Sequence, residues 1–255
     1  MARKDWTENA LVQQPAIEQL MGMGWQYTHA FDTEFKNGIS ILGRKSTHDV
    51  VLVNDLRPAL KRINPTAPDV VIEEAIVRIQ QRGLNVNLVE ENERRYTKFV
   101  VQTADTLKVT GTNTQGKQQE YIIQLIDFNN ASNNTYRIVD EMWVSNSINE
   151  RKRPDLLAFI NGLPFVFFEF KNTHISKDYA YKGNLNDYKD KIPHLFDYNA
   201  LVVISNMVEA TYGSITAPLE QFKQWKRNDE NDPEPPTQAN QQLYLLAGIM
   251  QPKTL

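Results

Sequence analysis

The side chains best suited to chemistry lie in one apolar stretch, residues 153–172, RPDLLAFINGLPFVFFEFKN. Asp155 follows a proline near its start, and Glu169 and Lys171 lie two residues apart near its end. Two carboxylates that meet at the end of a buried strand repel each other unless a cation lies between them. A hard divalent ion such as Mg²⁺ meets that need, with carboxylate oxygens, the Phe170 carbonyl and water as ligands.

These side chains form a minimal set for the hydrolysis of a phosphodiester. A bound Mg²⁺ polarises a phosphoryl oxygen and lowers the pKa of a bound water, while the Lys171 ammonium orients that water and offsets charge on the phosphate. The structural alternative is that Asp155 caps a strand and that Glu169 and Lys171 form an edge pair in solvent. The phenylalanines before Lys171 weaken that alternative, because they indicate a central strand whose end charges lie where α/β sheets bind ligands.

The geometry of this set depends on how the stretch folds back on itself. Asn161 and Gly162 are a strong hairpin signal, so the two apolar arms are predicted to pair as antiparallel strands. With a plain two-residue turn, Asp155 would pair with Phe168, and the side chains of Asp155 and Glu169 would point to opposite faces. A loop with an odd number of residues, or one bulge, would bring them to a shared face. We predict one of these, and the turn glycine is the cheapest place for a bulge.

Apolar periodicity predicts the elements that position this hairpin. Three helices are expected before it, over residues 7–23, over a segment that Ser46 or Thr47 caps and that ends before Pro65, and over residues 68–83. A polar loop is expected between the first two helices. Period-two patterns predict strands, with antiparallel pairing between neighbours, over residues 98–102, 106–111, 120–128 and 135–145. A helix over 177–191 and a buried parallel strand over 200–205 are expected after the hairpin.

Length and composition indicate a globular domain. The chain has 255 residues, of which 41% are hydrophobic, enough for a sizeable core. No apolar run is long enough to span a membrane, no signal peptide is recognisable and no cysteine is present, so a cytoplasmic protein without a membrane partner is predicted. The net charge of -3 argues against an overall basic coat for nucleic acid but allows a local basic groove.

The domain is predicted to span residues 1–225, with a helical insert at about 47–83. From residue 224 the chain becomes polar and rich in proline, which is typical of a linker. Residues 226–255 are therefore expected to be a polar linker and the start of a truncated following region.

The hairpin resembles a known family. The motifs Arg-Pro-Asp, Asn-Gly-Leu-Pro and Glu-x-Lys-Asn occur in this order in residues 153–172, with NPTAPDVVIEEAI before them and YKDKIPHLFDYNALVVIS and YGSITAP after them. Together they resemble the N-terminal nuclease region of restriction (R) subunits of type I restriction-modification enzymes, over about residues 7–225. The resemblance implies a PD-(D/E)xK nuclease fold, an α/β domain with a mixed central sheet flanked by helices.

The resemblance also implies roles for particular residues. Asp155 and Glu169 would be ligands of Mg²⁺, and Lys171 would be the catalytic lysine that positions water. The Gln-x-x-x-Tyr motif of the family, which is associated with DNA handling near the site, falls on Asn184 and Tyr188. Asparagine keeps the amide of the motif but shortens its reach by one methylene, which puts its DNA contact in doubt.

Two departures from the family pattern concern acidic residues. Nucleases of this fold often supply a glutamate from the first helix, and this chain has Gln13 where related R subunits commonly carry an acid. Glu8 and Glu18 are the remaining candidates, with Glu8 the expected third metal ligand, although both are equally typical of solvated helix residues. Asp140 and Glu141 lie where relatives often carry amides and are interpreted as surface or strand-end charges.

Three weaker signals complete the pattern. Arg44 precedes a predicted helix N-terminus and could contact a DNA phosphate, with a solvated loop as the alternative. GTNTQGK, residues 111–117, resembles a phosphate-binding loop but is followed by Gln118 and a strand, so a hairpin loop is predicted and no ATP site is expected in this chain. Among the four histidines, only His174 is expected near the hairpin.

Three hypotheses of function follow. The first is the Mg²⁺-dependent, double-stranded DNA endonuclease domain of a type I restriction R subunit. The resemblance implies that its cleavage depends on an ATP-driven, helicase-like motor in the same full-length chain and on modification and specificity subunits. The alternative is a catalytically weak docking or regulatory module for subunit assembly, which Gln13 and Asn184 favour. The third is a free-standing repair or recombination nuclease of the same fold.

Overall fold

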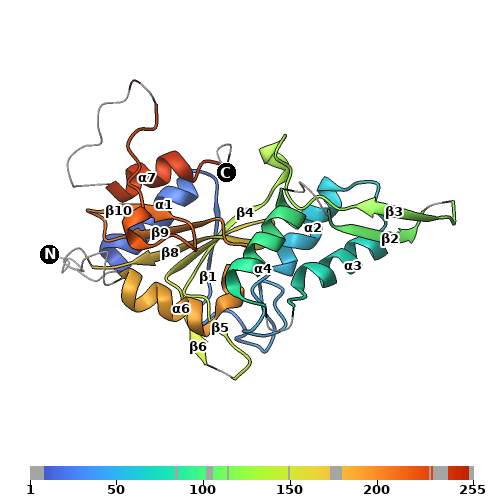
Figure 1. Ribbon diagram of the computed structural model, residues 1–255, viewed down its shortest axis with the longest axis horizontal. Helices are drawn as coiled ribbons and strands as arrows, with labels where there is room; N and C mark the ends of the chain where they lie inside the picture. Colours follow the sequence, from blue (N-terminus) through green and yellow to red (C-terminus); the bar gives the residue numbers. More distant parts are fainter. Residues whose placement is uncertain are drawn as a thin grey trace.

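The computed structural model describes residues 9–83, 86–101, 106–113, 115–148, 150–172, 180–229, 231 and 241–252. Six strands of this part form one sheet in the order β1-β4-β7-β8-β9-β10 (Figure 1). Their bounds are Gln26–His29, Tyr136–Asp140, Leu156–Ile160, Leu163–Phe170, Leu201–Ser205 and Ala210–Gly213. The β1-β4 and β8-β9 pairs are parallel and the others antiparallel. Helices flank the sheet, which confirms the predicted α/β fold with a mixed central sheet.

The two central strands of the hairpin are buried on both faces. Every residue of β7 and β8 is buried, because helices and loops cover both sides of the sheet. This explains why the sequence of these strands is apolar throughout instead of alternating between apolar and polar residues. The predicted parallel strand over 200–205 is also confirmed, as β9.

The first and last helices lie side by side against the sheet (Figure 1). They are α1, Gln14–Gly22, which continues a π-helical turn at Asn9–Gln13, and α7, Gln241–Ile249. Hydrogen bonds join them: the Gln19 amide donates to the Leu243 carbonyl at 2.6 Å and the Gln242 amide to the Val12 carbonyl at 2.8 Å. Leu245, Leu246 and Ile249 are buried in the same core as the sheet. The described end of the segment predicted as linker and following region therefore packs on this domain.

Three further helices and a hairpin lie at the end of the molecule opposite α1 and α7 (Figure 1). They are α2, Val53–Ile63, α3, Asp69–Gln80, α4, Leu88–Arg95, and the antiparallel strands β2, Lys108–Thr112, and β3, Gln118–Ile122. The hairpin confirms that the segment resembling a phosphate-binding loop joins two strands. Helix α6, Asn186–Lys191, follows a π-helical turn at Ala180–Leu185 and confirms the later part of the helix predicted over 177–191.

Two local predictions before the hairpin were wrong. Helix α2 begins at Val53 and not near Ser46, because the Asp49 carboxylate accepts from the Lys45 and Ser46 amides and forms a turn there. The predicted strand over 98–102 is, in its described part, a π-helical turn, Tyr96–Val100, that continues α4. Helix α4 was not predicted.

Three strand predictions also needed correction. The polar loop expected after the first helix contains β1, which was not predicted. The strand expected over 120–128 ends at Ile122. The strand expected over 135–145 breaks at Glu141, whose φ is 50°, into β4 and the short β5, Val144–Ser145. Among the described residues, no helix is long and apolar enough to cross a membrane.

The turn between β7 and β8 is buried beneath the start of α2. Asn161 and Gly162 both have positive φ, 51° and 77°, as a two-residue turn of type I′ requires. The Leu52 amide donates to the Gly162 carbonyl at 2.9 Å, and the Asn161 side chain binds the Leu125 carbonyl at 2.8 Å and the Thr135 amide at 2.7 Å. This turn therefore fixes one end of the central hairpin to the helical insert.

A methyl group at Gly162 tests this packing. A Cβ there would overlap the Leu52 carbonyl oxygen, whereas a Cβ at Gly116, which has the same φ of 77°, meets nothing within 4 Å. Gly116→Ala should lower the free energy of unfolding by about 1–2 kcal/mol from backbone strain alone. Gly162→Ala should lower it by about 3 kcal/mol or more, because strain and overlap add. Urea denaturation of both variants measures the difference, and equal losses would contradict the close contact with Leu52.

Candidate active site

The pairing of β7 with β8 decides whether the two predicted carboxylates meet. Next to the turn the ladder is regular, but it then skips Phe165, which is an extra residue on β8. Beyond this bulge Leu156 pairs with Phe168, so the next residues along each strand, Asp155 and Glu169, lie opposite each other. The structure confirms the prediction of a bulge or an odd loop that gives these residues a shared face.

The bulge does not lie at the turn glycine, where we expected it. It follows Pro164, which has no N–H to donate to a neighbouring strand, and proline inside a sheet is found mainly at such irregularities. The Phe165 carbonyl turns towards β9, where it accepts from the Ala200 amide at 2.8 Å and from the Asn199 side chain at 3.2 Å. The extra residue is therefore held by contacts with the neighbouring strand.

The three predicted residues meet where β8 ends and β7 begins. Glu169 is fully buried, and the Lys171 ammonium lies 2.5 Å from its Oε1 and 2.8 Å from the Phe170 carbonyl oxygen. Asp155 Oδ2 accepts from the Phe170 amide at 2.7 Å. The Lys171 amide donates to the Ser205 carbonyl at 2.9 Å and continues the pairing with β9. Side chains and backbone groups at the ends of three neighbouring strands, β7, β8 and β9, thus fix these groups relative to each other.

The oxygens of this site suit a hard divalent cation. Glu169 Oε1 and the Phe170 carbonyl already converge on one cationic group, the Lys171 ammonium, and Asp155 lies opposite Glu169. Among the described residues, no group of three or more histidine or acidic side chains gathers that could hold a metal ion. A metal here would rest on two carboxylates, a backbone carbonyl and water, and Mg²⁺ is commonly bound in this way. Glu8, the expected third ligand, lies outside the described residues.

The two residues predicted from the Gln-x-x-x-Tyr motif lie beside the carboxylates. The Asn184 side-chain amide donates to Glu169 Oε1, so the shorter side chain still reaches the site. The Tyr188 hydroxyl donates to the Arg153 carbonyl at 3.0 Å, and its ring packs edge-on against Phe167 at a centroid distance of 5.2 Å. Burial, and then the charge of Glu169, raises the pKa of Tyr188, so it stays a neutral donor. Their contact with DNA stays a prediction.

A second polar cluster adjoins the site and was not predicted. Asp140, at the end of β4, is only 3% exposed and accepts from the Tyr27 hydroxyl at 3.1 Å and from His29 Nδ1 at 2.9 Å. The Gln13 amide lies 3.4 Å from Asp140 Oδ2 and donates to the Asp155 carbonyl at 3.2 Å. Burial, and then the charge of Asp140, raises the pKa of Tyr27. Asp140 is therefore a buried strand-end charge, not a surface charge.

The signal that would have found this cluster is the parallel pairing of β1 with β4, which places His29 beside Asp140. That pairing could not be predicted because β1 was not recognised as a strand. His174, the histidine expected near the site, lies outside the described residues. Glu18 is exposed on α1 and accepts from Gln14 at 3.1 Å, which agrees with the solvated alternative.

Arg44 has a structural role that its sequence context did not reveal. Its side chain is buried, with Nη1 2.7 Å from Glu34 Oε2 and Nη2 2.7 Å from the Trp143 carbonyl. Its remaining bonds go to the carbonyls of Asp49 and Thr47. These contacts hold the loop before α2 and argue against the predicted contact with a DNA phosphate, because the guanidinium is enclosed by protein oxygens.

Comparison with known proteins gives consistent matches. The family model described as the type I restriction enzyme R protein N terminus matches residues 5–221. The type I restriction enzyme HindI endonuclease subunit of Haemophilus influenzae is 30% identical over 247 residues, which cover 96% of this chain and 23% of that protein. The putative type I restriction enzyme MjaIXP endonuclease subunit of Methanocaldococcus jannaschii is 28% identical over 232 residues, 88% of this chain and 21% of that protein. The chain thus spans less than a quarter of the length of these curated relatives.

The contact between Lys171 and Glu169 predicts strong coupling in stability. Lys171→Met takes an ammonium away from a fully buried carboxylate, and breaking a buried pair in this way costs about 3–5 kcal/mol. Glu169→Gln should cost less, because the glutamine carbonyl oxygen can still accept from the Lys171 ammonium and the Phe170 carbonyl still binds it. The double variant should recover most of the loss of Lys171→Met, because no buried charge remains. Unfolding of all four proteins in urea at pH 7 forms a double-mutant cycle, and additive losses would contradict the coupling.

Proposed function

The chain belongs to the family of type I restriction enzyme R protein N termini, and on this premise we propose that it is a metal-dependent, double-stranded DNA endonuclease domain. Both curated relatives are named endonuclease subunits. The single observation that carries the proposal is the bulge at Phe165, which brings Asp155 opposite Glu169. Without it, the two carboxylates would lie on opposite faces of the sheet and could not share an ion.

The proposed reaction is hydrolysis of a DNA phosphodiester. Asp155 and Glu169 would hold Mg²⁺ with the Phe170 carbonyl, and the ion when bound would polarise a phosphoryl oxygen and lower the pKa of a bound water. The oxygen of one water forms a bond to phosphorus while an ester P–O bond breaks, and the water loses a proton as the leaving oxygen gains one. Lys171, as an ammonium beside Glu169, would hold the attacking water and offset charge on the phosphate.

The neighbouring residues would serve to position these groups. The Asn184 amide binds Glu169 Oε1 and so fixes the orientation of that carboxylate. Gln13 and Tyr188 bind the backbone carbonyls of Asp155 and Arg153, on either side of the Asp155 side chain. A site held in this way loses little free energy to reorganisation when the reaction begins.

We propose that cleavage requires the rest of the full-length subunit. Since the chain spans less than a quarter of its curated relatives, an ATP-driven, helicase-like motor in the same polypeptide and the modification and specificity subunits would complete the enzyme. The isolated chain would then cut DNA poorly. A catalytically weak module for subunit assembly is the second candidate, and Gln13 favours it, because an amide occupies the position beside Asp155 where an acid could add a metal ligand.

Binding of metal separates the two candidates. Mg²⁺ or Mn²⁺ should bind the chain, and Asp155→Ala or Glu169→Ala should each weaken the affinity about tenfold or more, because a direct ligand is lost. Isothermal titration calorimetry measures the affinities. Asp69→Ala is the control, since this exposed carboxylate on α3 pairs with Lys61 and should not matter. No metal binding by the intact chain, or equal affinity in all variants, would contradict the nuclease proposal.

Replacement of the lysine tests the chemistry in the full-length subunit assembled with its partner subunits. Lys171→Ala should lower the rate of DNA cleavage about 10²-fold to 10³-fold, as expected for loss of one charge-stabilising donor, while ATP hydrolysis continues. Cleavage of a plasmid substrate and release of phosphate from ATP, measured in the same reaction, give both rates. Cleavage that survives the substitution would remove Lys171 from the mechanism.

A further inference from the structure

Two arginines lie on a small hairpin immediately before Asp155. Strands β5 and β6, Arg151–Lys152, are antiparallel and pair Ser145 with Arg151 and Val144 with Lys152. One residue further in the same register, Trp143 lies opposite Arg153. Arg151 and Arg153 are two residues apart and therefore project on the same side as Trp143.

Aromatic rings hold both guanidinium groups. The Arg153 guanidinium carbon lies 4.5 Å from the centroid of the Phe31 ring and 5.4 Å from that of Trp143, and the Arg151 carbon lies 4.6 Å from Trp143. Phe31 follows β1 and is 42% exposed. Rings that contact a guanidinium restrict its rotamers and leave its N–H edges for a ligand, so less entropy is lost on binding.

The charge of this cluster is only partly compensated. Arg153 lies 3.6 Å from the Glu141 carboxylate, a loose ion pair. Arg151 is exposed and makes no ion pair with a carboxylate within 4 Å in the part of the chain that the structure describes. A hollow of about 290 Å³ adjoins it, with Phe31, Lys45 and Trp143 among its lining residues. The cluster therefore offers fixed, water-facing cationic groups to an anion.

The cluster is tied directly to the carboxylates. Arg153 precedes Asp155 by two residues, which is at most about 7 Å along the chain, and its carbonyl accepts from Tyr188. We propose that Arg151 and Arg153, held by Trp143 and Phe31, are a phosphate clamp that binds the DNA backbone next to the phosphodiester to be hydrolysed. This assignment rests on the proposed function, and it adds a substrate-binding surface to the site.

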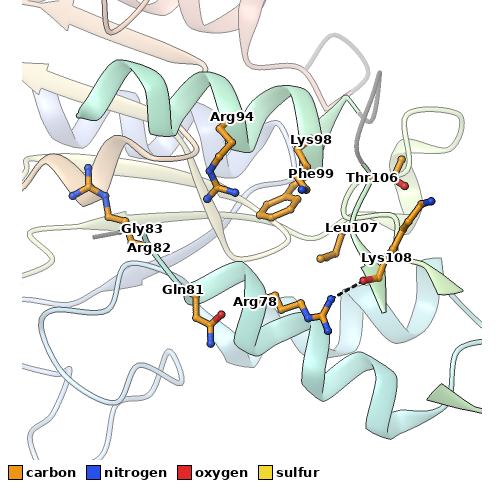
Figure 2. A pocket seen from close by; sticks show the side chains of 10 residues that line it. All are labelled: Arg78, Gln81, Arg82, Gly83, Arg94, Lys98, Phe99, Thr106, Leu107 and Lys108. Atoms are coloured by element: carbon orange, nitrogen blue, oxygen red, sulfur yellow. Dashed lines mark hydrogen bonds between the residues drawn. The ribbon is translucent and has the colours of Figure 1, made fainter. Parts of the chain in front are cut away.

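A second cationic hollow is an alternative site at which DNA could bind. It measures about 540 Å³ between α3 and α4, and Arg78, Arg82, Arg94, Lys98 and Lys108 line it (Figure 2).

Carboxylates hold several of the cationic groups in this hollow. Arg94 binds both oxygens of Glu91, Arg78 binds Glu74, and Arg82 binds Asp197. Asp197 precedes β9, whereas Glu169 pairs with Ile204 near the other end of that strand. The second hollow therefore lies away from Asp155 and Glu169, so its residues are suitable controls for the clamp.

The salt dependence of DNA binding tests the clamp without any cleavage. Fluorescence anisotropy would give the affinity of the chain for a short labelled duplex in EDTA at several salt concentrations. Arg151→Gln should reduce the slope of log affinity against log salt by about 0.9, because one phosphate contact is lost, and should weaken binding about five- to tenfold near 0.1 M salt. Arg151→Lys should keep the slope, and Trp143→Leu should weaken binding with the slope nearly unchanged. Arg78→Gln should behave like the unchanged chain.

Three outcomes would overturn the proposal of a phosphate clamp. An unchanged slope in Arg151→Gln, a lower slope in Arg78→Gln alone, or no binding of the duplex at low salt would each do so. The melting temperature of each variant shows whether it still folds. Because Arg151 is exposed, its replacement should leave the melting temperature unchanged. Failure of the clamp is distinct from failure of the nuclease: if Lys171→Ala stops cleavage while Arg151→Gln keeps the slope, only the clamp is excluded.

Discussion

The extra residue at Phe165 decides which face of the sheet the side chains beyond it point to, and the arrangement of the charged groups depends on it. Side chains of a strand alternate between two faces, so one additional residue moves everything beyond it to the other face. On the turn side of the bulge, the hairpin keeps the tight turn that Asn161 and Gly162 form beneath α2. On the other side, the shift brings Asp155 opposite Glu169. The bulge thus combines a tightly packed turn at one end of the hairpin with the proposed metal site at the other.

Glu169 is buried, so its carboxylate needs the hydrogen-bond donors and the cation that surround it. A carboxylate without access to water is stable only if donors or cations replace its solvation, and here the Lys171 ammonium and the Asn184 amide bind it. The resemblance to the family implies a catalytic role for Lys171 and a role in DNA handling for Asn184. The two groups that stabilise the buried Glu169 are thus also groups for which a functional role is proposed.

Local patterns sufficed for the hairpin but not for its surroundings. The need for a bulge or an odd loop could be predicted because it follows from counting residues between Asp155 and Glu169. The position of the bulge could not, because it depends on how Phe165 meets the segment before β9. Strand β1 escaped prediction because it has four residues, none of them fully buried, and its partner is more than a hundred positions away. The burial of Arg44 could not be predicted either, because it depends on the Trp143 carbonyl, 99 positions away, and on a loop fold that brings Glu34 to the guanidinium.

Gln13 and the preceding residue, Val12, connect the candidate site to helix α7. The Gln13 side chain holds the Asp155 carbonyl, and the carbonyl of the preceding residue, Val12, accepts from Gln242 on α7. Two hydrogen bonds on consecutive residues thus link the last described helix to the backbone of a carboxylate in the site. The position of α7 is therefore coupled, through Val12 and Gln13 of the π-helical turn before α1, to the backbone at Asp155.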